Sequence, residues 1–164
     1  MSTTALTIVG SGSSADELTQ LVTFVVGGEE YGVEVLKVRE IIRMPGITKM
    51  PNTPDFVEGI INLRGKVIPI VSMRKRFGLP ETECNSQTRI MIMDVAGDSM
   101  GFIVDGVSEV LRVSGSEVQP APTIAAGGLE QECIAGVISR PDRLLVVINA
   151  DRIVSTSERT MLEA

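Results

Sequence analysis

Short apolar runs rich in Val and Ile alternate with polar or glycine-containing links along most of this chain. Runs of this kind are typical of β-strands. The clearest pair lies in residues 58–71 (EGIINLRGKVIPIV), where a polar link ending in Gly65 predicts a β-hairpin turn. Arg64 then lies at the hairpin tip. It is either a solvated turn residue or a guanidinium group that a rigid hairpin presents to a partner.

The hairpin pattern occurs twice in the chain. Residues 136–149 (GVISRPDRLLVVIN) align with residues 59–72 at an offset of 77 (136 minus 59), apolar residue over apolar residue. Residues 100–111 align with residues 31–42 at an offset of 69 (100 minus 31), and Glu40 then matches Glu109. One insertion within residues 122–132 explains the difference between the offsets. We therefore predict a tandem duplication of an all-β unit, whose two copies pack on each other as two lobes.

Further hairpins are predicted where apolar runs flank short glycine-containing links. In the first copy, residues 21–26 and 31–38 flank the link GGEE, and in the second copy residues 90–95 and 100–104 flank AGDS. The connection at residues 44–55 contains three prolines, which exclude a helix there.

Each copy is predicted to end in a short capped helix, at residues 72–78 and at residues 149–154. The basic triplet at residues 74–76 is placed on the solvated side of the first helix. Lys37 is also expected to face solvent. Pro69 cannot donate a hydrogen bond to a sheet ladder, so its strand should lie at a sheet edge or carry a bulge at that position.

The domain boundaries follow from the same pattern. Residues 1–17 are rich in Ser, Thr and Gly and are predicted to be a flexible tail. Residues 18–154 are predicted to form one domain, with the first copy at about 18–80 and the second at about 86–154. Residues 155–164 are polar and form a second predicted tail.

Composition limits which residues can form the core and which classes of partner the chain can bind. The chain has 164 residues, 43% of them hydrophobic, but only 3% aromatic and no Trp, so the core must consist of Val, Ile, Leu and Met. A net charge of −6 argues against nucleic acid as a partner. No apolar run is long enough to insert into a membrane, and no signal peptide is evident. We therefore expect a cytoplasmic protein in which Cys84 and Cys133 are reduced.

Catalytic, metal and cofactor sites are not indicated. The chain contains no His, which removes histidine acid–base catalysis, Ser-His and Cys-His pairs and most zinc sites. Residues 10–15 (GSGSSA) fit the dinucleotide pattern, but only residues 16–20 could form the helix that the pattern requires before the next strand begins. We predict no catalytic residue, no metal and no cofactor, and hence no enzyme.

Four stretches carry a resemblance to a known family: YGVEVLKVREII at residues 31–42, PNTPDFVEG at 51–59, NLRGKVIPIVSMR at 62–74 and GFIVDGVSEV at 101–110. Together they resemble the CheW family of bacterial chemotaxis coupling proteins. The resemblance covers nearly all of residues 21–154. It implies two small, intertwined five-stranded barrels. It also implies a scaffold that links the cytoplasmic tips of chemoreceptors to the histidine kinase CheA, in arrays at the membrane.

The resemblance also implies two sets of partner-binding residues. The receptor-facing groove of the family falls on Val38, Glu40, Gly59, Asn62, Arg64 and Ile90. The loop that faces the regulatory domain of the kinase falls on Gln119, Pro120 and Ile124. Gln119 stands where relatives can have a basic residue, and Ile124 where they can have an aromatic one.

A stand-alone β-barrel that binds a small apolar molecule is the alternative function. The two functions make opposite predictions for the interior of the fold. Side chains of Val, Ile, Leu and Met should fill the interior of so small a barrel. A large enclosed apolar pocket would favour the ligand-binding alternative.

Overall fold

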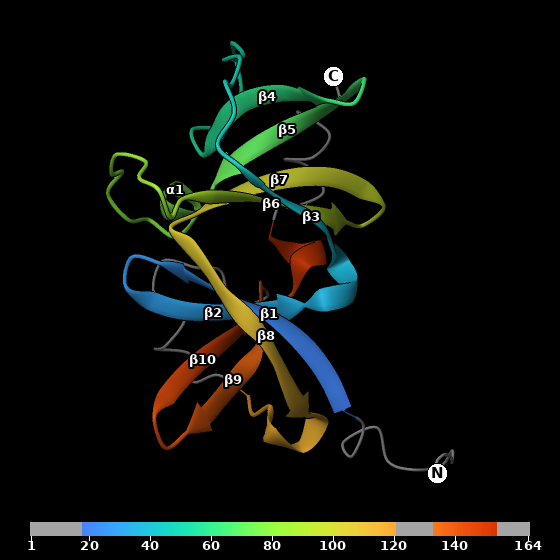
Figure 1. Cartoon of the computed structure of the whole chain (residues 1–164), viewed down its shortest axis with the longest axis vertical. Helices are drawn as coiled ribbons and strands as arrows, with labels where there is room; N and C mark the ends of the chain where they lie inside the picture. Colours follow the sequence, from blue (N-terminus) through green and yellow to red (C-terminus); the bar gives the residue numbers. More distant parts are fainter. Residues whose placement is uncertain (1–17, 121–132, 154–164) are drawn as a thin grey trace.

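The computed structural model describes residues 18–120 and 133–153, which form ten β-strands and a few short helices (Figure 1). The first copy contributes β1 (Leu18–Val26), β2 (Glu29–Glu34), the 3-10 turn η3 (Val35–Lys37), β3 (Val38–Arg43), β4 (Val57–Leu63), β5 (Lys66–Ser72) and helix α1 (Met73–Arg76). The second copy contributes β6 (Arg89–Val95), β7 (Asp98–Val104), β8 (Gly106–Ser114), the 3-10 turn η4 (Gly115–Glu117), β9 (Ile134–Arg140), β10 (Arg143–Ile148) and the 3-10 turn η7 (Ala150–Arg152).

The strands form two five-stranded sheets, and each sheet contains strands from both copies. The upper lobe of Figure 1 has the order β3-β6-β7-β5-β4, and the lower lobe has the order β8-β1-β2-β10-β9. Each lobe therefore combines the first hairpin of one copy with the last three strands of the other. The all-β, intertwined fold is confirmed. The simpler expectation that each copy would form its own lobe is wrong.

The exchanged strands join through matched parallel pairs. In the upper lobe Ile70 of β5 lies beside Gly101 of β7, and in the lower lobe Val147 of β10 lies beside Gly32 of β2. In the duplication Gly32 matches Gly101, and Ile70 matches Val147. A Cβ atom at Gly101 would lie 2.6 Å from the Ile70 side chain, so the close approach requires glycine.

Pro69 corrects one expectation. Its strand β5 is an interior strand, and the one register shift between β4 and β5 lies between Val57 and Gly59 rather than at Pro69. The missing N–H is tolerated because the pairing of β5 with β7 begins only at Ile70. The matching residue in the second copy, Val146, has an N–H and pairs with Tyr31.

A single bridge returns the chain to the far edge of each sheet. Thr48, which follows β3, exchanges two backbone hydrogen bonds of 2.9 and 2.8 Å with Ile60 of β4. Gln119, which follows β8 and η4, exchanges bonds of 2.9 and 2.8 Å with Val137 of β9. Ile60 and Val137 are again matched positions. The same bridge is thus present at the same place in both lobes.

The largest hydrophobic core is shared between the two lobes. It includes Phe24 and Val26 from the lower sheet and Met93 and Phe102 from the upper sheet, all fully buried. Each lobe has in addition a small core of its own, formed by Ile61, Ile68, Ile70, Ile90 and Ile92 in the upper lobe and by Leu21, Val113, Ile138, Leu145 and Val147 in the lower lobe. Neither sheet can therefore bury its apolar surface without the other.

Both predicted short helices form, and both are capped. The Ser72 hydroxyl accepts a bond from the Lys75 N–H, and the Asn149 side chain accepts one from the Asp151 N–H. The second helix is a 3-10 turn rather than an α-helix. Cys84 is an exposed thiol, whereas Cys133 is buried with its Sγ 2.7 Å from the Arg152 carbonyl oxygen.

The basic triplet of α1 is not solvated as predicted, because each member contacts a remote segment. Arg74 bonds the Asp105 carboxylate, and Lys75 Nζ lies 2.9 Å from Glu58 Oε2. Arg76 donates a 2.7 Å bond to the Ile153 carbonyl oxygen and lies over the Phe56 ring. The triplet ties α1 to its surroundings.

Several predictions fall outside the described residues. They concern the two tails, the GSGSSA motif, the insertion within residues 122–132 and Ile124. Across residues 18–120 and 133–153, no helix is both long enough and apolar enough to cross a membrane.

Candidate partner-binding site

The hairpin turn between β4 and β5 presents Arg64 away from the body of the upper lobe. Arg64 and Gly65 both have positive φ, 53° and 84°, as a tight two-residue hairpin turn requires. The Asn62 side chain fixes the turn, because its Oδ1 accepts a 2.9 Å bond from the Gly65 N–H. The Arg64 side chain remains 71% exposed. The turn therefore holds a guanidinium group at a defined position in solvent.

Glu40 of β3 pairs with Arg64 through two parallel hydrogen bonds. Arg64 Nη1 lies 2.8 Å from Glu40 Oε1, and Arg64 Nη2 lies 2.6 Å from Glu40 Oε2. The hydrogen bonds from Arg64 hold the pKa of the Glu40 carboxyl below its ordinary value. Fork-to-fork geometry of this kind orients both groups. The pair leaves the outer side of the guanidinium available to a partner.

The second copy has a related ion pair with a different arrangement. Pro141 replaces Arg64 at the matched turn position, and the guanidinium comes instead from Arg143, the first residue of β10. Arg143 Nη2 lies 2.8 Å from Glu109 Oε2 and 2.7 Å from Glu30 Oε2. Its side chain is only 23% exposed. The matched glutamates thus serve an exposed arginine in one lobe and a half-buried arginine in the other.

Val38 lies two residues before Glu40 and marks the boundary between the lobes. It is half-buried and packs against the shared core, as do Val35 of η3 and Val107 of β8. We call these three valines the interlobe valines. They join the two lobes at a partly exposed apolar surface, which begins on the same strand that carries the Glu40–Arg64 pair.

Gly59 and Ile90 are buried and act within the fold. A Cβ atom at Gly59, where φ is 149°, would lie 2.1 Å from the Thr48 carbonyl oxygen, so only glycine permits the bridge at Ile60. Ile90 is fully buried in the small core of the upper lobe and pairs with Ile42 of β3. Both residues support the surface around β3 and β4 from beneath.

Two of the predicted kinase-facing residues, Gln119 and Pro120, belong to the described part of the chain and lie in the lower lobe. Gln119 is exposed, but its backbone is fixed by the bridge to Val137. Pro120 follows it and is exposed as well. The Glu40–Arg64 pair lies in the other lobe.

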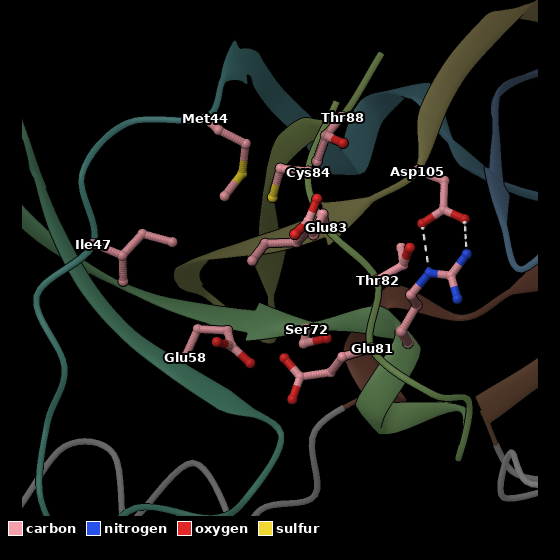
Figure 2. Close-up of a pocket in the computed structure, with 12 residues that line it drawn as sticks. Met44, Ile47, Glu58, Ser72, Glu81, Thr82, Glu83, Cys84, Thr88 and Asp105 are labelled. Carbon is pink, nitrogen blue, oxygen red and sulfur yellow. Dashed lines mark hydrogen bonds and ion pairs between the residues drawn. The ribbon is translucent and has the colours of Figure 1, made fainter. Parts of the chain in front are cut away.

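A pocket of about 120 Å³ lies at the margin of the upper lobe. Figure 2 shows the residues that line it. Its walls include Glu58, Glu81 and Glu83 beside Met44 and Cys84. Such a lining is too charged for a small apolar ligand, which favours larger, mostly apolar cavities. The interiors of the two sheets are filled instead by the small Ile-rich and Leu/Val-rich cores.

Sequence reasoning selected Glu40 and Arg64 but not their contact, since 24 residues separate them. The duplication gave no signal for this contact, because Pro141 stands at the position matched to Arg64 and the guanidinium of the second hairpin comes from Arg143. Asn62 was also predicted as a site residue, but its role in fixing the turn was not predicted.

The intertwined β-lobes, the filled interiors and an arginine displayed on a rigid hairpin fit a protein-binding module of the scaffold class. The family model of the CheW-like domain matches residues 20–158. The chain belongs to the CheW-like family, whose members act in chemotaxis as scaffold proteins and not as enzymes.

The chain aligns with individual relatives over most of their length. The chain is 32% identical to the chemotaxis protein CheW of Klebsiella aerogenes, with 88% of this chain and 86% of that protein covered. It is 36% identical to CheW of Rhizobium meliloti, with 85% and 90% covered. The crystal structure of the scaffolding protein TtCheW from Thermoanaerobacter tengcongensis superposes with a TM-score of 0.79 at 32% identity, covering 87% of this chain and 96% of that one.

Proposed function

We propose that this chain is a non-enzymatic adaptor that couples the cytoplasmic tips of chemoreceptors to the histidine kinase CheA. The observation that carries the proposal is the Glu40–Arg64 pair, in which Arg64 lies in the rigid β4–β5 turn and Glu40 lies on β3, the strand that also carries Val38. An apolar surface bordered by a few oriented charges suits an amphipathic helix. In this proposal the receptor tip supplies that helix. The adaptor would be cytoplasmic and recruited to membrane-associated receptor arrays.

The two partners would occupy different places. The receptor helix would contact Val38, Glu40 and Arg64, with Asn62, Gly59 and Ile90 holding that surface in shape. The regulatory domain of CheA would contact the lower lobe at Gln119 and Pro120, together with Ile124. Separate sites are what coupling requires, because both partners must be bound at once.

The proposal is tested by reconstitution from purified components. CheA kinase activity is measured with receptor-containing membranes, with and without this chain, and with the Arg64→Ala variant. We expect stimulation only when the wild-type chain is present. Binding to a receptor-tip fragment and to the CheA regulatory domain is measured separately, and Arg64→Ala should weaken the first by roughly tenfold or more while leaving the second unchanged. Wild-type activity of the variant in both assays would contradict the receptor-site assignment.

A further inference from the structure

Two small clusters join the lobes at related places, and each contains one carboxylate that accepts a backbone N–H from a hairpin turn. In the first cluster the carboxylate is Asp105, between β7 and β8. It accepts a 2.9 Å bond from the Gly27 N–H in the β1–β2 turn. It also accepts bonds of 2.9 and 2.6 Å from Arg74 Nε and Nη2, drawn as dashed lines beside Asp105 in Figure 2. We call this group latch 1. It ties a lower-lobe turn to the upper-lobe helix α1.

Latch 2 has the same parts with the charges exchanged. Its carboxylate is Asp151 in η7, which accepts a 2.9 Å bond from the Ala96 N–H in the β6–β7 turn. Lys37, at the end of η3, places Nζ 3.1 and 3.0 Å from the two carboxylate oxygens. The Lys37 side chain, which was expected to face solvent, is 33% exposed and pairs with this carboxylate. Latch 2 ties an upper-lobe turn to the short helix that follows the lower-lobe strand β10.

The duplication relates the two latches position by position. Gly27 matches Ala96 at the offset of 69, and Arg74 matches Asp151 at the offset of 77. The third members, Asp105 and Lys37, lie in matched connections between a hairpin and the following strand, one residue out of register. In latch 1 the helix supplies the base and the connection the acid. In latch 2 the helix supplies the acid and the connection the base.

The copies contribute to each latch in a fixed way. The turn and the helix come from one copy, and the connection comes from the other, because the lobes exchange hairpins. If each copy folded on itself instead, each helix residue would meet the connection of its own copy. Arg74 would then face Lys37, and Asp151 would face Asp105. Both contacts would join like charges at half-buried positions, which is strongly unfavourable.

We propose that the opposite polarity of the two latches specifies the exchange of hairpins between the copies, by repelling the arrangement in which each copy folds on itself. This is selection against a competing structure, of the kind that charges supply in coiled-coil pairing. The two copies have matched strands and matched parallel pairs, so the competing structure satisfies the same backbone pattern. The latches distinguish the two arrangements by charge. The inference concerns folding and does not depend on the proposed receptor and kinase contacts.

Two cysteine pairs report which arrangement forms. Gln20 and Arg112 are exposed partners on β1 and β8, so Gln20→Cys with Arg112→Cys reports the exchanged lobes. Arg43 matches Arg112 at the offset of 69 and is exposed, so Gln20→Cys with Arg43→Cys reports a copy folded on itself. Each pair is introduced into the full chain together with Cys84→Ser. The protein is refolded from urea under thiol–disulfide exchange, and the yield of cross-linked monomer is measured.

The decisive variant is Arg74→Asp with Asp105→Arg. It keeps opposite charges in latch 1, but it makes both self-folded contacts attractive, since the acid at 74 would meet Lys37 and the base at 105 would meet Asp151. We expect the cross-link between positions 20 and 43 to rise roughly threefold or more relative to the natural latches. The mirror variant, Lys37→Asp with Asp151→Lys, should do the same through latch 2, and it serves if the first variant folds poorly.

Combining all four substitutions reverses both latches and restores their opposite polarity. We expect the cross-link between positions 20 and 43 to return to the level of the natural latches, with the cross-link between positions 20 and 112 dominant. Equal yields of the 20–43 cross-link with natural, doubly and quadruply substituted latches would overturn the proposal. The latches would then stabilise the interface without specifying it.

Discussion

The ion pairs Glu40–Arg64 and Glu109–Arg143 use glutamates at matched positions, yet they differ in what surrounds the arginine. Arg64 lies within the turn, is 71% exposed and contacts a single carboxylate. Arg143 lies at the start of a strand, is 23% exposed and is shared by Glu109 and Glu30. The first pair displays a guanidinium group to solvent. The second pair ties strands of the lower lobe together, and the comparison separates the proposed binding surface from a structural contact.

The largest effect is expected when the second copy is removed, because both lobes then lose part of the core that they share. A fragment of residues 1–84 retains Glu40 and Arg64 but loses β6 to β10, and with them half of the core that both lobes share. We expect the fragment to be poorly soluble or dimeric, because it exposes the apolar faces of two incomplete sheets. Sedimentation and urea unfolding test this. A monomeric fragment with a cooperative transition would show that the lobes fold independently.

Charge reversal at the matched glutamates is the next test. Glu40→Lys places a second positive charge beside Arg64 and should weaken binding of a receptor-tip fragment by roughly tenfold or more. Binding to the CheA regulatory domain should be retained. Glu109→Lys is the matched control and should change receptor binding little.

Affinities of both variants for both partners decide the assignment. Equal losses of receptor binding would mean that the receptor surface has been placed on the wrong face. Equal losses of thermal stability would mean that both glutamates are structural.

Truncating the two arginines compares stability rather than binding. Arg143→Ala leaves Glu30, whose side chain is 19% exposed, without its partner in the lower lobe. We expect a loss of about 1 kcal/mol of unfolding free energy, or roughly 2–4 °C in Tm. Arg64→Ala should shift Tm by roughly 1 °C or less, because the side chain is exposed. Thermal unfolding of the two variants side by side measures the difference, and a larger Tm loss for Arg64→Ala would make its role structural.

The sequence predicted the parts of the fold that depend on neighbouring residues. Hairpins, turns and capped helices follow from local patterns, and the duplication is visible because matched residues keep their character. The exchange of hairpins depends on pairings between distant strands, such as β1 with β8, and only the family resemblance implied it. The errors at Pro69 and at Arg74 have the same cause. Their neighbours, Gly101 beside β5 and Asp105 beside Arg74, come from the other copy.

The smallest expected effect is a difference in titration within the upper lobe. The hydrogen bonds from Arg64 lower the pKa of Glu40. For Asp105, burial raises the pKa, but the bonds from Arg74 and the Gly27 N–H outweigh it, and the net direction is also downward. A carboxyl whose pKa is lower in the folded state contributes stability above its unfolded pKa of about 4, and this is lost as the pH falls through the folded value.

Carboxyl titration followed by NMR therefore separates the Glu40–Arg64 pair from latch 1. In Arg64→Ala, the pKa of Glu40 should rise toward its ordinary value, while that of Asp105 stays low, because Arg74 and Gly27 still bond it. The Glu40 shift should shrink as salt is added, since the pair is exposed and salt screens such contacts. Glu40 titration that is the same with and without the Arg64 side chain would show that the two groups do not pair in solution. The guanidinium would then be free to turn, and the rigid display of Arg64 would have to be abandoned.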